Sequence, residues 1–401
     1  MSVNHAAAPL SARDGRSGNA QIVATVFITF VGYLTIGLPL AALPIHVHAD
    51  LGYGTVVAGL AVSIQYIATV LTRARVGQIA DTRGPKLTVL AGLVACFASG
   101  ALLAASALLE PAGALGLIFA SRLALGIGES LIGTGAIAWA IGRVGPEYTA
   151  RIIAWNGVST YGALAAGAPA GVMLAGWLGF GAIGVSVMLL AAAGLAIAWP
   201  KPAPPIRRGE ARLGIGHVFR RILPHGAALA LSTIGFGTIT TFVTLYYAAQ
   251  HWTGAAFALS VFGLAFIACR LLFADTINRH GGFPVAIVSL VLQTAGLLVL
   301  WCAGSPPLAL VGAGLTGFGF SLVFPAIGVV AVARVPAANR GSALGLYSMF
   351  LDVALGITGP AAGLIAGRFT EATPFLFGAV ATAASLAVTL VLAMKREDRP
   401  T

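Results

Sequence analysis

The sequence is poor in charged residues, and above all in acidic ones. Only 9% of the 401 residues are Asp, Glu, Lys or Arg, and 12 acidic residues stand against 23 basic ones. A water-soluble domain carries roughly a quarter of its residues as charged side chains. With 58% hydrophobic residues and a mean hydropathy of +0.94, the composition excludes a soluble protein and predicts an integral membrane protein.

Cysteine is also scarce. Cys96, Cys269 and Cys302 lie in apolar runs at separations that suggest neither a disulfide framework nor metal ligation. The stretch from His46 to Asp50 could ligate a metal if extended, but no further His or Cys cluster supports a metal site. The apolar runs contain no paired aspartates, no Ser–His arrangement and no phosphate-binding loop. We therefore expect no enzyme, no ATP-driven pump, no metal and no cofactor.

The chain divides into apolar runs that are long enough to cross a bilayer. A helix of about 20 residues spans ~30 Å of hydrocarbon. The fold class predicted is an all-α integral membrane protein with twelve transmembrane helices. The predicted spans are 21–43, 54–76, 85–108, 112–142, 148–173, 177–199, 224–248, 255–277, 283–303, 307–333, 340–366 and 372–394.

Basic residues near the predicted span ends indicate the orientation, because Lys and Arg collect on the cytosolic side. On the opposite side only Arg368 is found. On the side of the N-terminus lie Arg73, Arg75, Arg83, Lys86, Arg143, Arg151, Arg279, Arg334, Arg340 and the segment 395–399. We predict a multi-pass protein of the bacterial inner membrane with both termini in the cytoplasm. This bias and anionic lipid headgroups explain the net charge of +11, so no nucleic-acid partner is needed.

A basic, proline-rich segment divides the chain into halves. The predicted units are a cytosolic tail at 1–20, a six-helix bundle at 21–199, a linker at 200–223, a second six-helix bundle at 224–394 and a cytosolic tail at 395–401. From Ile215 to Leu223 the apolar residues recur every three to four positions. This pattern favours an amphipathic helix on the cytosolic leaflet. A partly ordered tether is the alternative.

The two halves repeat each other in sequence, so we expect them to be pseudo-symmetric. Arg73 and Gly84 match Arg270 and Gly281, which stand 197 residues later. Gly126–Ser130 matches Gly317–Ser321, and Pro169 matches Pro360, each 191 residues later. Two six-span halves related by a parallel repeat, with substrate bound between them near the midplane, are the arrangement of a large transporter class.

Three motifs resemble one family of transporters along essentially the whole chain. The stretch Gly77-Gln-Ile-Ala-Asp81-Thr-Arg83-Gly84-Pro85-Lys86 resembles the signature between the second and third spans of the major facilitator superfamily. Residues 121–129 resemble its fourth-span motif with a membrane-embedded arginine, here Arg122. Gly167-Ala-Pro169-Ala-Gly171 resembles a loosened fifth-span antiporter motif that lacks the usual glycine before its proline. Together these motifs imply the exporter branch. The run from Gly37-Leu-Pro39 to Asp50-Leu-Gly-Tyr-Gly54, with Gly128-Glu-Ser130, further resembles a bacterial subgroup of drug or metabolite exporters.

The charged stretch also predicts a gate. Gly84 and Pro85 permit a sharp turn, and Asp81 can pair with a neighbouring arginine or a helix N-terminus when the halves are close. In the second half Asn278 replaces Asp81, so a charge-dependent latch is expected on the first half. The candidate gating residues are Arg73, Gly77, Asp81, Arg83, Gly84, Arg270, Asn278 and Gly281. The alternative is a topology determinant that merely keeps the loop inside.

Two acidic residues, Glu129 and Asp352, lie near the middle of predicted spans. A charge inside a membrane is a functional hypothesis by default, and a carboxyl group that alternates between dry and hydrated surroundings can load and release a proton. Arg122 precedes Glu129 by two helical turns, roughly 10 Å along one face. We predict that Glu129, Arg122 and Asp352 serve proton coupling. Structural hydrogen bonds are the alternative.

Weaker candidates could line a substrate cavity, although packing against lipid or core is the alternative for each. They are Tyr33, Gln65, Asn156, Tyr161, Thr238, Phe318 and Tyr347. The sequence thus predicts a monomeric secondary transporter in the lipid bilayer that exports a small organic solute or drug in exchange for protons by alternating access. An importer or uniporter of a small metabolite on the same fold, or a non-transporting receptor, remains the alternative.

Overall fold

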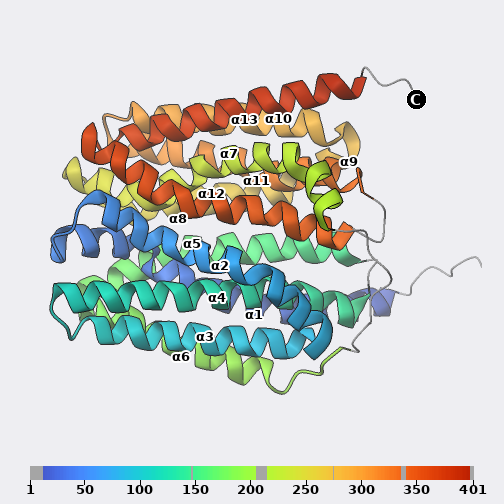
Figure 1. Ribbon diagram of the computed structural model, residues 1–401, viewed down its shortest axis with the longest axis horizontal. Helices are drawn as coiled ribbons and strands as arrows, with labels where there is room; N and C mark the ends of the chain where they lie inside the picture. The colour runs from blue at the N-terminus through green and yellow to red at the C-terminus, as the bar shows by residue number, and fades with distance from the viewer. Residues whose placement is uncertain (1–11, 146–147, 205–214, 274, 336–339, 398–401) are drawn as a thin grey trace, which may run out of the picture.

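The protein is a bundle of long, roughly parallel helices (Figure 1). A computed structural model describes residues 12–145, 148–204, 215–273, 275–335 and 340–397. The described elements are α1 (Ala12–Ile45), η1 (His46–Asp50), α2 (Thr55–Arg83), α3 (Pro85–Ser106), α4 (Pro111–Val144), α5 (Thr149–Leu178), α6 (Gly181–Ala198), α7 (Ile215–Ala249), α8 (Ala255–Phe273), α9 (Thr276–His280), α10 (Gly282–Trp301), α11 (Pro306–Val332), α12 (Arg340–Arg368) and α13 (Thr373–Glu397). Within these residues, 12 helices are long and apolar enough to cross a membrane. The predicted fold class is confirmed.

The helices form two six-span halves that lie side by side. In the first half α3 packs on α4 and α6, and α1 packs on α5. In the second half α10 packs on α11 and α13, and α7 packs on α12. These are the same pairings under the repeat. The halves meet where α2 crosses α12, where α5 crosses α8, and along α1 and α7.

The charged stretch that begins at Arg73 is helical over most of its length, where the sequence suggested a compact turn. Helix α2 continues to Arg83, and the turn is confined to Gly84 with φ +95°. A run without proline or a second glycine after Gly77 can propagate the helix, and a basic last turn suits the negative end of the helix dipole. Gly281 occupies the repeated position with φ +84°, a backbone conformation that favours glycine.

The amphipathic segment of the linker is the beginning of α7, so the structure has no separate surface helix at 215–223. Residues 205–214 of the predicted linker lie outside the described part of the chain. Val218 and Ile222 are buried against the core of the second half, and Phe219 stacks on Phe350 with 5.8 Å between ring centroids. The apolar face of this segment therefore packs against the second half of the protein, where the sequence suggested that it lies on lipid.

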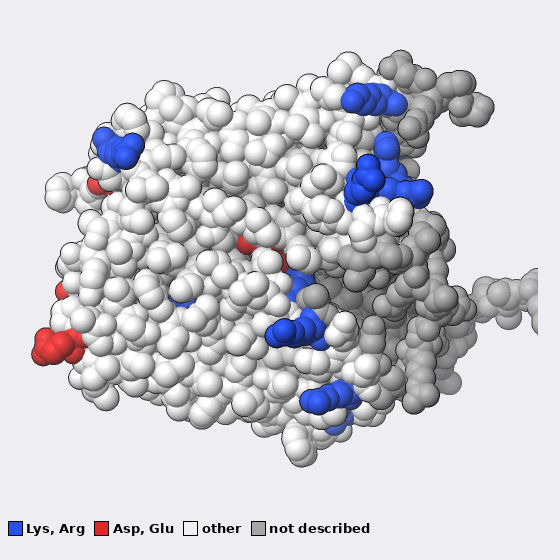
Figure 2. Space-filling view, in the orientation of Figure 1, with Lys and Arg blue, Asp and Glu red and all other residues white. Residues whose placement is uncertain are grey.

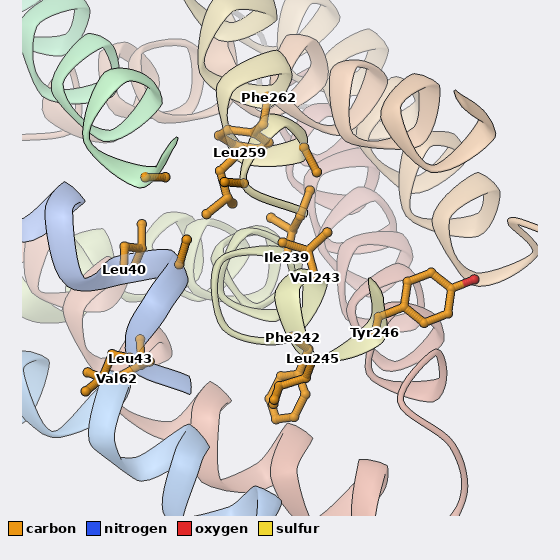
Figure 3. Packing of buried hydrophobic residues seen from close by; sticks show 14 of the residues in the cluster. Leu40, Leu43, Val62, Ile239, Phe242, Val243, Leu245, Tyr246, Leu259 and Phe262 are labelled. Atoms are coloured by element: carbon orange, nitrogen blue, oxygen red, sulfur yellow. The ribbon is translucent and has the colours of Figure 1, made fainter. Parts of the chain in front are cut away.

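One apolar core reaches across both halves. Leu40 and Leu43 of α1 and Val62 of α2 belong to the same buried cluster as residues of α7 and α8 (Figure 3). Interdigitated side chains of this kind resist sliding, so the halves meet as a packed surface. We call the end of the bundle where α13 finishes, at Glu397, the terminal end. The other end, where α1 meets η1 and α2 begins, is called the opposite end, and the apolar cluster lies toward it.

Matching hydrogen bonds join the halves at both crossings. The Ser63 hydroxyl donates to the Leu355 carbonyl oxygen at 2.7 Å, and the Ser260 hydroxyl donates to the Ala165 carbonyl oxygen at 2.8 Å. These serines stand 197 residues apart, at equivalent places of the repeat. Nearer the opposite end, the Thr55 hydroxyl donates to the Gly363 carbonyl oxygen at 2.9 Å. The α2–α12 crossing is thus closed toward the opposite end.

Close backbone approach at this crossing yields a first prediction. A Cβ atom at Gly59 would collide with the Gly359 carbonyl group, and one at Gly359 would collide with Gly59 and Ser63. Gly59→Val should destabilise the state in which α2 and α12 are closed at the opposite end by about 1–3 kcal/mol. The fraction of molecules that are open at that end should then rise by at least about fivefold. Spin labels at Asp50 and His251 of a cysteine-free variant would report the distance between the halves.

The matched control is Gly116→Val on α4, because Gly116 is exposed and a Cβ atom there has open space around it. This variant should keep the wild-type distance distribution between the labels. If Gly59→Val also keeps it, the glycine contact does not hold the opposite end closed.

Candidate functional site

An ion pair joins the two halves inside the membrane-spanning region. The Arg73 Nη2 atom of α2 lies 2.6 Å from the Asp352 Oδ2 atom of α12. The side chain of Asp352 is 2% exposed and that of Arg73 is 22% exposed. Sequence analysis assigned Arg73 to a gate and Asp352 to proton coupling, and the structure brings the two residues together. One contact between the halves therefore depends on the charge of a buried carboxyl group.

Glu129 lies buried on α4 beside α2. Its Oε2 atom accepts a hydrogen bond from the Gln65 Nε2 atom at 3.1 Å, and the Gln65 Oε1 atom is buried without a partner among the described residues. Gln65 precedes Arg73 on the same helix, α2, by about two turns. Glu129 and the Arg73–Asp352 pair are thus joined through α2, and we call Glu129, Gln65, Arg73 and Asp352 the polar cluster.

Arg122 is fully buried, and its three guanidinium nitrogens have no hydrogen-bond partner in the described part of the chain. Around it α4 packs closely on α2. The Thr69 hydroxyl donates to the Gly126 carbonyl oxygen at 3.0 Å, and a Cβ atom at Gly126 would collide with the Gln65 carbonyl group. A buried cation without partners is costly, and Glu129, two helical turns further along α4, is an acidic residue of opposite sign on the same helix.

The second crossing has different chemistry at the equivalent place. Tyr161 on α5 stands 191 residues before Asp352, and its ring stacks on Phe266 at 3.7 Å between centroids. The Arg270 guanidinium, equivalent to Arg73, lies 5.2 Å from the Phe266 ring centroid and donates from Nη2 to the Ser321 carbonyl oxygen at 2.7 Å. One crossing thus carries an ion pair, and the other carries an arginine among aromatic rings.

Sequence analysis missed the aromatic cluster to which Tyr161 belongs. Phe236 stacks on Phe320 at 5.0 Å and on Phe262 at 5.3 Å between centroids, and Tyr161 meets Phe236 edge-on at 5.7 Å. These rings come from α5, α7, α8 and α11, so no periodicity along one helix could have grouped them. The repeat could have shown that Tyr161 and Asp352 occupy equivalent positions, because they stand 191 residues apart.

Of the weaker cavity candidates, Gln65 belongs to the polar cluster and Tyr33 lies beside it. A Cβ atom at Gly133, one turn beyond Glu129, would lie 3.2 Å from the Tyr33 hydroxyl oxygen. Asn156 on α5 is half-buried next to Gly157, whose added Cβ atom would lie 3.7 Å from the Arg270 guanidinium.

Three other candidates pack inside the second half. Thr238 donates its hydroxyl to the Gly235 carbonyl oxygen at 2.9 Å, and Tyr347 donates its hydroxyl to the Phe324 carbonyl oxygen at 3.1 Å. Phe318 meets Phe273 edge-on at 5.7 Å between centroids. The structure does not bring these three side chains to the polar cluster, because local packing already satisfies them.

The remaining gating candidates lie beyond the spans at the terminal end. Arg83 is exposed, and the side chain of Asp81 lies outside the described residues. In the second half Asp275 accepts hydrogen bonds from Arg279 Nε at 2.7 Å and Asn278 Nδ2 at 3.4 Å. These bonds and the charge of Arg279 lower the pKa of Asp275. Asn278 therefore joins a local surface pair instead of a contact between halves.

A shallow cavity of about 260 Å³ lies between the halves at the opposite end. Ile45, His48, Ala49 and Thr55 line it from the first half, and Leu245, Ala248, Ala249 and Glu371 line it from the second. Twelve spans among the described residues form two halves, with a polar cluster at their interface and a cavity between them at the opposite end. This arrangement is typical of membrane transporters.

Comparisons with known proteins establish the family. A sequence profile described as Major Facilitator Superfamily matches residues 25–283 and 226–401. An uncharacterized MFS-type transporter of Burkholderia mallei is 56% identical over 394 residues, which cover 98% of this chain and 97% of the relative. One of Pseudomonas aeruginosa is 52% identical over 382 residues, covering 95% and 94%. The chain belongs to the major facilitator superfamily.

Solved structures show the same fold at low sequence identity. A D-xylose-proton symporter matches with a TM-score of 0.75 at 16% identity, covering 92% of this chain and 96% of the symporter. The human organic anion transporter MFSD10 matches with a TM-score of 0.71 at 16% identity, covering 93% and 99%. Similarity at this identity carries the fold alone, so the solute must be argued from this chain's own residues.

Proposed function

We propose that the protein exports a small organic solute across the bacterial inner membrane in exchange for protons, by alternating access of its two halves. The observation that carries this proposal is the Arg73–Asp352 ion pair, 2.6 Å long and shared between the halves. Conformational switches work through contacts that differ between states. A buried carboxylate that joins the halves is such a contact, because protonation changes its charge.

Exchange follows from competition for the same groups. A carboxylate at Asp352 attracts Arg73 and keeps α2 against α12, whereas a proton on Asp352 removes that attraction. Arg73 is 22% exposed, so it can be hydrated when it leaves its partner. Glu129, hydrogen-bonded to Gln65, is the carboxyl group to which we assign the transported proton, whereas the charge of Asp352 controls the contact between the halves. A solute that binds these carboxylates excludes the proton, and a proton excludes the solute, which is the condition for antiport.

The orientation is part of the proposal and is supported by the distribution of charge. Basic residues gather toward the terminal end in Figure 2, and Arg368 marks the opposite end. Arg83 lies in the last turn of α2 and Arg143 in that of α4, both at the terminal end. By the positive-inside rule that end faces the cytoplasm. The cavity at the opposite end then opens to the periplasm, where the solute would leave.

Reconstituted flux tests the proposal. Purified protein in proteoliposomes should accumulate at least one solute from a panel of organic cations, anions and neutral metabolites against its gradient when a pH gradient is imposed. One proton moving through ~100 mV supplies about 2.3 kcal/mol, which sustains a solute gradient of about 50-fold. Equal flux with and without the pH gradient would point to a uniporter, and no flux for the whole panel would favour a receptor.

A second prediction concerns the charged stretch at the terminal end of α2. We infer that Asp81 serves as a charge-dependent latch, whereas Asn278 in the repeat does not. Asp81→Asn should lower transport about tenfold without loss of expression, an effect of about 1.4 kcal/mol. Asn278→Ala should change transport less than about twofold, since Asn278 is exposed and its side-chain hydrogen bond within the described residues goes to Asp275 in its own turn. Equal, large losses of transport for both variants would show that the loss in Asp81→Asn does not come from the missing charge.

A further inference from the structure

The chain that follows α6 is fixed against the terminal end of the first half. Residues 199–204 form this segment, which we call the strap. The Lys86 Nζ atom of α3 donates to the Trp199 carbonyl oxygen at 2.6 Å. The Trp139 Nε1 atom of α4 donates to the Pro202 carbonyl oxygen at 3.0 Å. The first residues of the linker are therefore bound to the ends of two helices of the first half.

Three basic side chains gather at the strap. Lys86 bonds to the strap, Arg143 lies in the last turn of α4, and Lys201 belongs to the strap itself. All three are half-buried, and within the described residues none of them is paired with a carboxylate. Partial burial and the neighbouring charge of Arg143 both lower the pKa of Lys201, because poor hydration and a second cation disfavour its charged form. An anion bound among these side chains would offset that repulsion.

The strap lies at the level of the lipid headgroups. It follows directly on α6, which is long and apolar enough to cross a membrane. The Trp199 side chain is 71% exposed, and that of Leu87, next to Lys86, is 56% exposed. An exposed tryptophan at the end of a membrane span is typical of the boundary between headgroups and acyl chains. The anionic groups that are present at this level are the phosphates of phospholipids.

The second half has different chemistry at the equivalent place. The repeat maps Arg143 onto Arg334 at 191 residues and Lys86 onto Phe283 at 197 residues. Phe283 is 5% exposed, and its ring stacks on the buried His225 ring with 6.4 Å between centroids. A packed aromatic ring thus stands where the first half has a lysine. The cluster of three basic side chains therefore belongs to the first half.

We propose that Lys86, Arg143 and Lys201 bind the phosphate of one anionic phospholipid. This site lies outside the proposed transport mechanism and depends on neither the solute nor the direction of transport. A headgroup with a net negative charge, such as that of phosphatidylglycerol, is attracted by all three cations. The ammonium group of phosphatidylethanolamine is repelled by them. The bound phosphate holds the strap on α3 and α4, so the linker between the halves begins at a fixed point on the membrane surface.

The test measures lipid binding to the full-length protein in detergent by native mass spectrometry. Phosphatidylglycerol and phosphatidylethanolamine are titrated separately. We expect one phosphatidylglycerol to bind at least about tenfold more tightly than phosphatidylethanolamine. Lys201→Gln and Arg143→Gln should each weaken phosphatidylglycerol binding about fivefold, the effect of one basic residue near an anionic headgroup. The unfolding temperature of each variant in the same detergent shows whether it is folded.

Arg220→Gln is the matched control, because Arg220 is an exposed basic residue near the start of α7. Figure 1 shows the start of α7 well away from the end of α6. This variant loses the same charge as Lys201→Gln. It should change phosphatidylglycerol binding less than about twofold, because salt screens a charge that lies far from the bound headgroup.

Three results would overturn the site. The first is equal affinity for the two phospholipids, and the second is an equal effect of Lys201→Gln and Arg220→Gln, which would show unspecific attraction to the basic end. The third is displacement of phosphatidylglycerol by millimolar inorganic phosphate, which would make free phosphate the ligand. Selective phosphatidylglycerol binding that is weakened by Lys201→Gln and kept by Arg220→Gln would support the site. Solute flux is a separate readout, so failure of the lipid site leaves the proposed antiport untouched.

Discussion

Asp352→Ala should lower the thermal stability of the protein more than the double substitution of Asp352 and Arg73 by Ala. Removing one partner of a buried ion pair leaves an uncompensated charge and costs about 3–5 kcal/mol. The lower end of this range applies here, because Arg73 is 22% exposed and water can reach it. Replacing both partners removes the charge that would be stranded. Thermal unfolding of the purified protein in one detergent measures the difference.

The control for this comparison is the surface pair of Arg279 and Asp275, whose atoms are 2.7 Å apart and whose side chains are 73% and 62% exposed. Exposed pairs add little to stability, so Asp275→Ala should hardly change the unfolding temperature. Additive losses for the two single substitutions at Arg73 and Asp352 would mean that the pair does not act as a unit.

Glu129→Gln should abolish accumulation of solute against its gradient while leaving downhill exchange. Gln keeps the shape of the side chain and can still bond to Gln65, but it cannot carry a proton. The 50-fold gradient that one proton sustains at ~100 mV should therefore fall to about onefold. Uphill and downhill flux are measured at several pH values, and the pH dependence of exchange should become weaker.

Glu110→Gln is the matched control, because Glu110 is an exposed acid next to the start of the same helix. It should keep the wild-type gradient. If Glu129→Gln still concentrates solute with an unchanged pH dependence, Glu129 is not the coupling group and Asp352 takes that role.

The sequence predicted the fold because composition and repetition act on the whole chain. Long apolar runs must form helices in lipid, where every backbone polar group needs an internal partner. The separations of 197 and 191 residues predicted the pairing of the halves, and Ser63 and Ser260 now show equivalent hydrogen bonds at the two crossings. Gly84 stands at the sharp turn that the sequence predicted, with φ +95°, and Gly281 has φ +84° at the repeated position.

The candidate site was predicted only in part, because its contacts join distant helices. Intramembrane charge singled out Glu129, Asp352 and Arg122, since each is rare in an apolar run. No local pattern indicated that Asp352 meets Arg73, 279 residues away in the sequence. The aromatic cluster around Tyr161 was also missed, because its rings come from helices that are distant in the sequence. Thr238, Phe318 and Tyr347 were selected by residue type alone, and residue type does not distinguish a cavity from a packed core.

The central claim is that solute and protons move in opposite directions through this protein. The most direct measurement records both in the same proteoliposomes, with a pH-sensitive dye inside and no imposed pH gradient. Adding the solute identified by the flux screen outside should raise the internal pH as the solute enters, and Glu129→Gln should abolish the rise. Solute entry with constant internal pH, or with a fall in internal pH, would contradict antiport.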